Sequence, residues 1–214
     1  MSADTIEKLA LLALGWLLGM LGPVVTEAIK RRRENGLVKV ALAAELRELS
    51  YMLALVNYLV NIHFGTVDRT YLNWLQGATA SYVGPNRTET TQRSIEMQLG
   101  LPDAQLAALV QTQKANEGTN IVIRKFAVPL LDARVSSLWN LESRVQILLL
   151  DIRSNVNLLN ELVDQARYYN CLTFGKLEAE QYERVVSNLE GCHRQYAERA
   201  KRIVGKIEEL SALI

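Results

Sequence analysis

The chain has 214 residues, a formal net charge of +1 and 49% hydrophobic residues, enough for one sizeable hydrophobic core. The balanced charge excludes a global electrostatic field that would recruit nucleic acid. The only two cysteines, Cys171 and Cys192, exclude a disulfide framework and fit a reducing cytoplasm.

The first predicted element, in residues 1–29, is an uncleaved membrane helix with a short N-terminus outside. The run LALLALGWLLGMLGPVV, Leu9 to Val25, is uncharged and lies near the lower length limit for crossing a ~30 Å hydrocarbon core. A buried core helix, the alternative, normally has a polar face, which this run lacks. A secretory signal peptide would begin with a basic region, whereas the chain begins MSADTIEK.

A basic juxtamembrane linker, residues 30–36, follows the predicted span. Positive charges beside a span stay in the cytoplasm, so we expect a single-pass protein with its C-terminal domain cytoplasmic. These charges are also expected at the membrane surface, beside anionic lipid headgroups. They are Lys30, Arg31, Arg32 and Arg33.

Small residues recur on one stripe of the predicted span, at Gly15, Gly19, Gly22 and Thr26. Lipid tails supply no hydrophobic drive for association, so close approach through small residues is a usual way for spans to pack. This favours self-association, with an isolated anchor as the alternative. If a cytoplasmic collar holds the helices apart, the same stripe lines a narrow pore, and Leu11 and Leu12 form an apolar constriction.

Residues 37–80 are predicted to form a long helix, Leu37 to Phe64, and a short helix from Asp68 to Ala80, because their apolar residues recur with helical spacing. Gly36 is the only helix breaker between the span and the long helix, which predicts one rod from membrane to cytoplasm. Residues 81–120 are a polar insertion with one modest helix near Pro102 to Asn116, and we expect this insertion to be mobile.

Residues 121–214 are predicted to form an antiparallel coiled-coil hairpin that starts at Pro129 and turns at Thr173 to Lys176. Two apolar stripes with alternating spacings of four and three fold back on each other, which pairs Leu159 with Leu189 and Val156 with His193. In this register Glu142 lies beside Lys206, and we expect the two to form an ion pair that fixes the register. The whole chain is therefore predicted to be all-α, with the long helix Leu37 to Phe64 packed on the hairpin. The stripes contain Leu131, Val135, Leu138, Glu142, Val145, Leu149, Ile152, Val156, Leu159, Val163, Ala166 and Asn170 on one arm, and Tyr182, Val186, Leu189, His193, Tyr196, Ala200, Ile203, Ile207, Leu210 and Ile214 on the other.

No catalytic or metal-binding motif is present: the sequence contains no GxxxxGK[ST], GxGxxG, HExxH or CxxC. His63 has no second histidine or cysteine at ligand spacing, and His193 lies in an apolar stripe, where a core histidine is the commoner case. We therefore expect no enzyme, no cofactor and no metal.

Basic residues are numerous on the hairpin, and in the simpler interpretation they form a solvated face. In the functional interpretation they hold an anionic ligand, such as a nucleotide or oligonucleotide, where the faces of several subunits converge. The candidates are Arg144, Arg153, Arg167, Arg194, Arg199, Lys201 and Arg202.

The segment GWLLGMLGP, the adjacent KRRR and the paired heptad arms resemble the small single-span membrane effectors of bacterial antiphage defence, most closely the channel-forming effector of the Hailong type. The resemblance is one of architecture. It implies a homo-tetrameric ion channel of the bacterial inner membrane that depolarises the cell. The channel would be held closed by a nucleotide-derived ligand from a partner nucleotidyltransferase. The alternative is a non-conducting, membrane-tethered coiled-coil scaffold that recruits a cytoplasmic partner.

Overall fold

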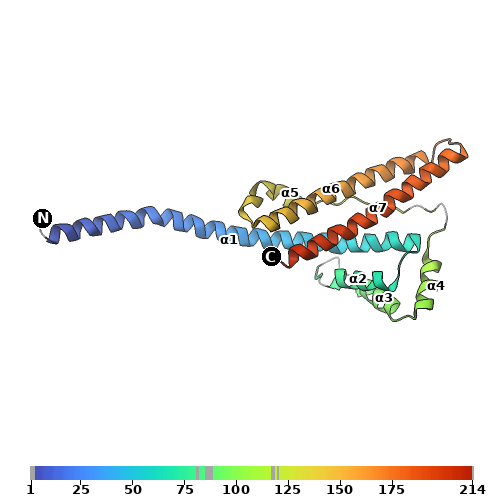
Figure 1. Ribbon diagram of the computed structural model, residues 1–214, viewed down its shortest axis with the longest axis horizontal. Coiled ribbons are helices and arrows are strands. Elements are labelled where there is room, and N and C mark those ends of the chain that lie inside the picture. Colours follow the sequence, from blue (N-terminus) through green and yellow to red (C-terminus); the bar gives the residue numbers. More distant parts are fainter. Residues whose placement is uncertain (1–2, 81, 85–88, 117–118, 120, 214) are drawn as a thin grey trace. The chain divides into compact units, whose positions relative to one another are not determined.

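The computed structural model describes residues 3–80, 82–84, 89–116, 119 and 121–213 (Figure 1). Within the first helix, the side chains of residues 3–10, 12–13, 17–18, 23–24, 28, 31–32 and 34–35 lie outside the description. The described residues confirm the all-α prediction, since their regular elements are all helices. These are α1 (Ala3–Phe64), α2 (Arg69–Ala80), α3 (Glu89–Leu99), α4 (Asp103–Gln113), α5 (Pro129–Arg134), the 3₁₀ helix η1 (Val135–Asn140), α6 (Ser143–Leu172) and α7 (Ala179–Ser211).

The chain divides into two compact units, residues 1–41 and 42–214. The first unit consists of the N-terminal part of α1, which stays helical through the predicted linker and through Gly36. Among the described residues, no helix combines the length and apolarity needed to cross a membrane. The expected span, Leu9 to Val25, is thus not found there, and its side chains at 9–10, 12–13, 17–18 and 23–24 lie outside the described residues.

The second unit is built on α6 and α7, which lie side by side in opposite directions (Figure 1). The predicted stripes are buried from Val145 to Ala166 on α6 and from Leu189 to Leu210 on α7, so the periodicity identified this core correctly. The C-terminal part of α1 packs on α7, where the Asn57 amide donates a hydrogen bond to the Ala197 carbonyl. The long helix is therefore the third member of the bundle, as expected.

The first arm of the hairpin is shorter than the stripe predicted, because the chain leaves the α-helix between Val135 and Glu142. Here Ser137 Oγ donates to the Arg134 carbonyl at 2.9 Å, and Asn140 Nδ2 donates to the Ser137 carbonyl at 3.3 Å. Such local side-chain bonds to the backbone compete with helix formation. The apolar spacing continues through the break because Leu138 still reaches the core.

The expected ion pair between Glu142 and Lys206 is not the one that forms. Lys206 Nζ pairs with the Asp151 carboxylate, more than two turns further along α6. Glu142 is exposed and extended, immediately before the first turn of α6. The reason is the helix break, which removes Glu142 from the seam.

Near the hairpin turn, the register of α6 against α7 also differs from the predicted one, in the same direction as at Lys206. Cys192 Sγ lies 4.0 Å from Gln165 Oε1, whereas the predicted register placed the neighbouring His193 opposite Val156. Apolar stripes with a seven-residue repeat match again after a slide of one heptad. The stripes alone therefore left the register open, and the polar contacts distinguish one match from the next.

The connection from α1 to α2 is fixed by a helix cap at each side. Gly65, at φ +66°, ends α1 in a Schellman motif, in which Gly65 N–H donates to Ile62 O and Thr66 N–H to Asn61 O, each at 2.9 Å. Asp68 then caps α2 by accepting a hydrogen bond from Tyr71 N–H at 2.6 Å. These caps set the positions of the side chains that line the cleft described below.

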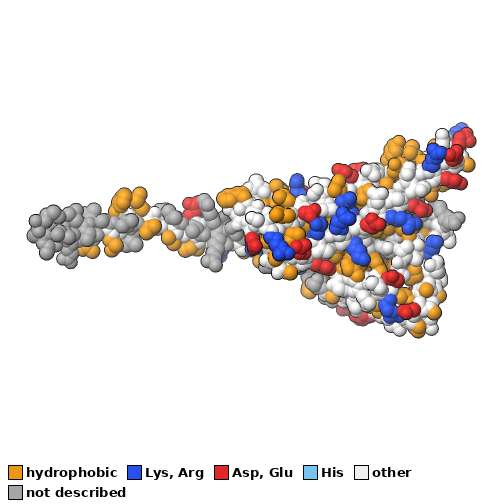
Figure 2. Space-filling view, viewed as in Figure 1, with side chains coloured by type: hydrophobic (Ala, Val, Ile, Leu, Met, Phe, Trp, Pro, Cys, Tyr) orange, Lys and Arg blue, Asp and Glu red, His pale blue; other side chains and the backbone are white. Residues whose placement is uncertain are grey.

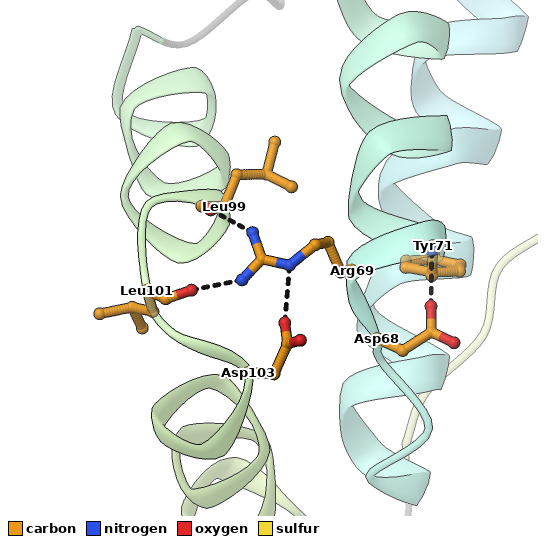
Figure 3. Close-up of polar contacts among 6 residues, drawn as sticks. All are labelled: Asp68, Arg69, Tyr71, Leu99, Leu101 and Asp103. Atoms are coloured by element: carbon orange, nitrogen blue, oxygen red, sulfur yellow. Dashed lines mark hydrogen bonds and ion pairs between the residues drawn. The ribbon is translucent and has the colours of Figure 1, made fainter.

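Arg69, in the first turn of α2, fastens the region of α3 and α4 to α2 (Figure 3). Its guanidinium pairs with the Asp103 carboxylate at 2.7 Å and donates to the carbonyl oxygens of Leu99 and Leu101. The predicted insertion thus contains α4, close to the single helix expected, and also α3, which we did not expect from its polar composition.

Candidate functional site: a cationic cleft between α1, α2 and α7

An open cleft of about 310 Å³ lies within the second unit, where the end of α1 and the start of α2 face α7. Helix α1 supplies amide and aromatic groups, α2 a tyrosine, and α7 two cations and one acid. The lining residues are Asn57, Val60, Asn61, Phe64, Thr66, Tyr71, Arg194, Ala197, Glu198 and Lys201.

Asn57, only 1% exposed, joins all three helices at this cleft. Its Nδ2 donates to Ala197 O, and its Oδ1 accepts from Tyr71 Oη at 2.5 Å and from Asn61 Nδ2 at 2.9 Å. Burial raises the pKa of Tyr71 far above its ordinary value, so the phenol remains a hydrogen-bond donor at all physiological pH values. This network holds the rigid side of the cleft in place.

Both cations of the cleft lie over aromatic rings. The Arg194 guanidinium carbon is 4.1 Å from the centroid of the Phe64 ring, and Lys201 Nζ is 4.9 Å from that of Trp74. Lys201 Nζ also lies 5.8 Å from the Tyr71 centroid. Cation–π contacts of this kind hold a long side chain in place and leave its outer face free to meet an anion.

The charge of the cleft is weakly positive. Arg194 has a loose ion pair with Glu190, at 3.7 Å, whereas Lys201 has no ion pair within the described part of the chain. Glu198 is the one acid among the described residues that line the cleft. Over the visible face of residues 42–214, basic and acidic side chains are interspersed, so the positive character is local to such clefts (Figure 2).

The groups that line the cleft can contact an anion. The cleft offers two cations seven residues apart on α7, about 10 Å along the helix axis, together with amide and hydroxyl groups and aromatic faces. The residues that the structure describes contain no group of three or more potential metal ligands. An anion with two charged or aromatic groups is the ligand that such a surface fits best.

The structure separates the seven basic residues that the sequence grouped together. Arg194 and Lys201 share the cleft, whereas Arg167 lines a different one. Other members have partners: Arg144 pairs with Glu209 at 3.1 Å, Arg153 with Asp132 at 2.5 Å, and Arg199 donates to Asn155 at 3.0 Å. Arg202 is exposed on α7.

The predicted small-residue stripe in α1 has an open surface in this chain. A Cβ at Gly15, Gly19 or Gly22 would meet no other described group within 4 Å. Thr26 Oγ1 donates to the Gly22 carbonyl at 2.8 Å. Leu11 is exposed, as are Lys30 and Arg33 in the basic run, whereas the side chains of Leu12, Arg31 and Arg32 lie outside the described residues.

Sequence reasoning missed the amide and aromatic part of the cleft. Asn57 and Asn61 are four residues apart in VNYLVNIHF, so they lie on one face of an otherwise apolar helix. Buried amides on such a face need partners, which was a usable signal for a polar contact at this point. Comparison of this chain with protein families, with curated proteins and with solved structures found no match.

Proposed function

We propose that this chain is the subunit of a homo-oligomeric inner-membrane protein whose N-terminal helix crosses the bilayer and forms a gated ion channel. The cytoplasmic helical unit, with α6 and α7 as a coiled-coil hairpin, binds an anionic ligand that holds the channel closed. The proposed role as an antiphage effector rests on the resemblance described above. The proposed subunit number, four, has the same basis.

One observation carries this proposal: the described large apolar side chains between Leu11 and Ile29 are each more than half exposed. Exposed apolar runs of this length are rare on soluble monomers and mark surfaces that lipid or another protein covers. Because these side chains point to several sides of the helix, lipid together with neighbouring copies of the same helix would cover them best. They are Leu11, Leu14, Trp16, Met20, Leu21, Val25 and Ile29.

The cleft supports a ligand-dependent function. It is lined by segments from the first third and from near the end of the chain, α1–α2 and α7. A ligand that bridges Lys201 and the α1 amides would therefore favour the arrangement in which these elements are together. A ligand shifts an equilibrium only by its difference in affinity between two states, about 1.4 kcal/mol for each tenfold change in population. Modest contacts in the cleft therefore suffice for gating.

The test uses the purified full-length chain in liposomes, with single-channel current or a membrane-potential dye as the readout. Conductance is expected without ligand, and the dinucleotide pApA, as the probe, is expected to reduce it. Gly19→Leu should abolish conductance because it fills the open stripe, whereas Gly205→Leu, at an equally open helical glycine on α7, should leave conductance unchanged. Lys201→Gln should weaken the effect of pApA, with Arg202→Gln as the matched control.

The outcomes separate the channel from the alternative scaffold. An inserted oligomer that remains electrically silent would refute the channel and favour a membrane-tethered scaffold, which needs only that the apolar helix anchors the chain. If pApA did not change the conductance, the proposed pore would stand, but the proposed class of ligand would be refuted. Equal effects of Gly19→Leu and Gly205→Leu would show that the stripe has no special role.

A further inference from the structure

A second and smaller cleft, of about 80 Å³, lies between the extended segment 121–123 and the α6–α7 pair. Its walls are apolar, formed by Ile121, Ile123, Val163 and Leu189 together with their neighbours. Three polar residues also line it: Arg167, Asn170 and His193. It is distinct from the cationic cleft, since the two sets of lining residues share no member.

The chain just after the segment 121–123 is held against both helices. Asn160 on α6 accepts a hydrogen bond from Phe126 N–H at 2.9 Å and donates to Phe126 O at 2.7 Å. Tyr196 on α7 donates to Arg124 O at 2.8 Å, and Lys125 pairs with Asp164 at 2.6 Å. The segment that closes the cleft is therefore anchored at its C-terminal end.

His193 is the unusual group in this cleft because it is only 3% exposed and makes no hydrogen bond within the described part of the chain. A histidine that lines a cleft and makes no such hydrogen bond can offer its ring nitrogens to a ligand or a water. Burial lowers the pKa of His193 to about 4, so at neutral pH its imidazole is uncharged and offers one donor and one acceptor. Arg167, exposed nearby, has no ion pair with any described residue.

We propose that this cleft binds a short-chain hydroxycarboxylate, with its carboxylate on Arg167, its methylene groups between Val163 and Leu189, and its hydroxyl on His193. A guanidinium is well suited to a carboxylate, and a neutral imidazole hydrogen-bonds a hydroxyl. The apolar walls between the two groups exclude a ligand that is charged throughout.

The size of the cleft favours a short ligand. At about 80 Å³ it is much smaller than the cationic cleft, which has about 310 Å³.

The experiment follows the two histidine rings of the full-length chain in detergent micelles by carbon–proton NMR during titration with 4-hydroxybutyrate. Since His63 and His193 are the only histidines, the two signals can be assigned from one variant. The His193 signal should shift with a Kd at least about tenfold lower than for butyrate, which lacks only the hydroxyl, or for 1,4-butanediol, which lacks the carboxylate. An unmoved His193 signal, or equal affinity for all three compounds, would overturn the proposal.

Substitution of the exposed arginine supplies the second arm, because it leaves the core intact. Arg167→Gln should weaken 4-hydroxybutyrate binding at least about tenfold and leave 1,4-butanediol binding unchanged. Arg184→Gln is the matched control, since Arg184 is exposed near the same end of the hairpin and pairs only with Glu180 one turn away. Unchanged binding by Arg167→Gln would refute the assigned carboxylate position and with it the proposed ligand class.

Discussion

Acidification should destabilise the helical unit through His193. The pKa of this histidine falls from 6.5 to about 4 on folding, mainly because of burial and secondarily because of the charge of His63. A group whose pKa is lowered in the folded state contributes stability above its unfolded pKa and loses it as the pH falls. Between pH 7 and pH 4 the loss integrates to about 3 kcal/mol, at 1.36 kcal/mol for each pH unit.

The measurement is urea unfolding of the full-length chain in detergent micelles, followed by far-ultraviolet circular dichroism across this pH range. His193→Gln has no titrating ring, so its free energy of unfolding should fall by about 3 kcal/mol less than that of the wild type. His63→Gln should keep most of the pH dependence, because His193 is still present in this variant. The pKa of His63 is itself lowered from the ordinary value of 6.5, but His63 is less buried than His193. Parallel curves for wild type and His193→Gln would refute the inference that the ring is buried and neutral.

Three further predictions concern the caps, the network and the register. Asn57→Ala should lower the free energy of unfolding by about 3 kcal/mol. In a double-mutant cycle with Tyr71→Phe, the coupling energy should be about 1 kcal/mol; full additivity would show that the two side chains do not interact. Gln165→Cys should form a disulfide with Cys192 on mild oxidation, detected by peptide mass spectrometry, whereas the register predicted from the sequence would keep the two sulfur atoms apart. Gly65→Ala should cost about 1–2 kcal/mol in thermal unfolding, and Gly65→Asn less, because asparagine tolerates φ > 0; equal stability of Gly65→Ala would argue against the Schellman cap.

The periodicity of the sequence determined which residues form the core of the hairpin. Leu149, Ile152 and Leu159 on α6 and Ile203 on α7 are at most 2% exposed, as their spacing predicted. The reason is local: a helix turns by a fixed angle per residue, so apolar side chains at alternating intervals of three and four must lie on one face. The turn near Thr173 and the short helix that ends at Ala80 were predictable for the same reason.

Periodicity could not detect where the helix stops or how two helices align. The stripe runs unbroken across Ser137 and Asn140 because a 3₁₀ turn still directs Leu138 inward. The register is equally hidden, since a seven-residue repeat matches itself after each slide. Only specific polar contacts, such as that between Asp151 and Lys206, distinguish the alternatives.

Only the tertiary structure determines which residues meet in the cationic cleft. Asn57 and Ala197 are 140 residues apart in the chain, and their hydrogen bond depends on how α1 lies against α7. The same packing separates Arg194 and Lys201 from the other basic residues and places them over Phe64 and Trp74 respectively. The spacing of residues in a sequence specifies local geometry. Contacts between distant segments depend instead on how several helices pack together, and the spacing within one helix does not contain that information.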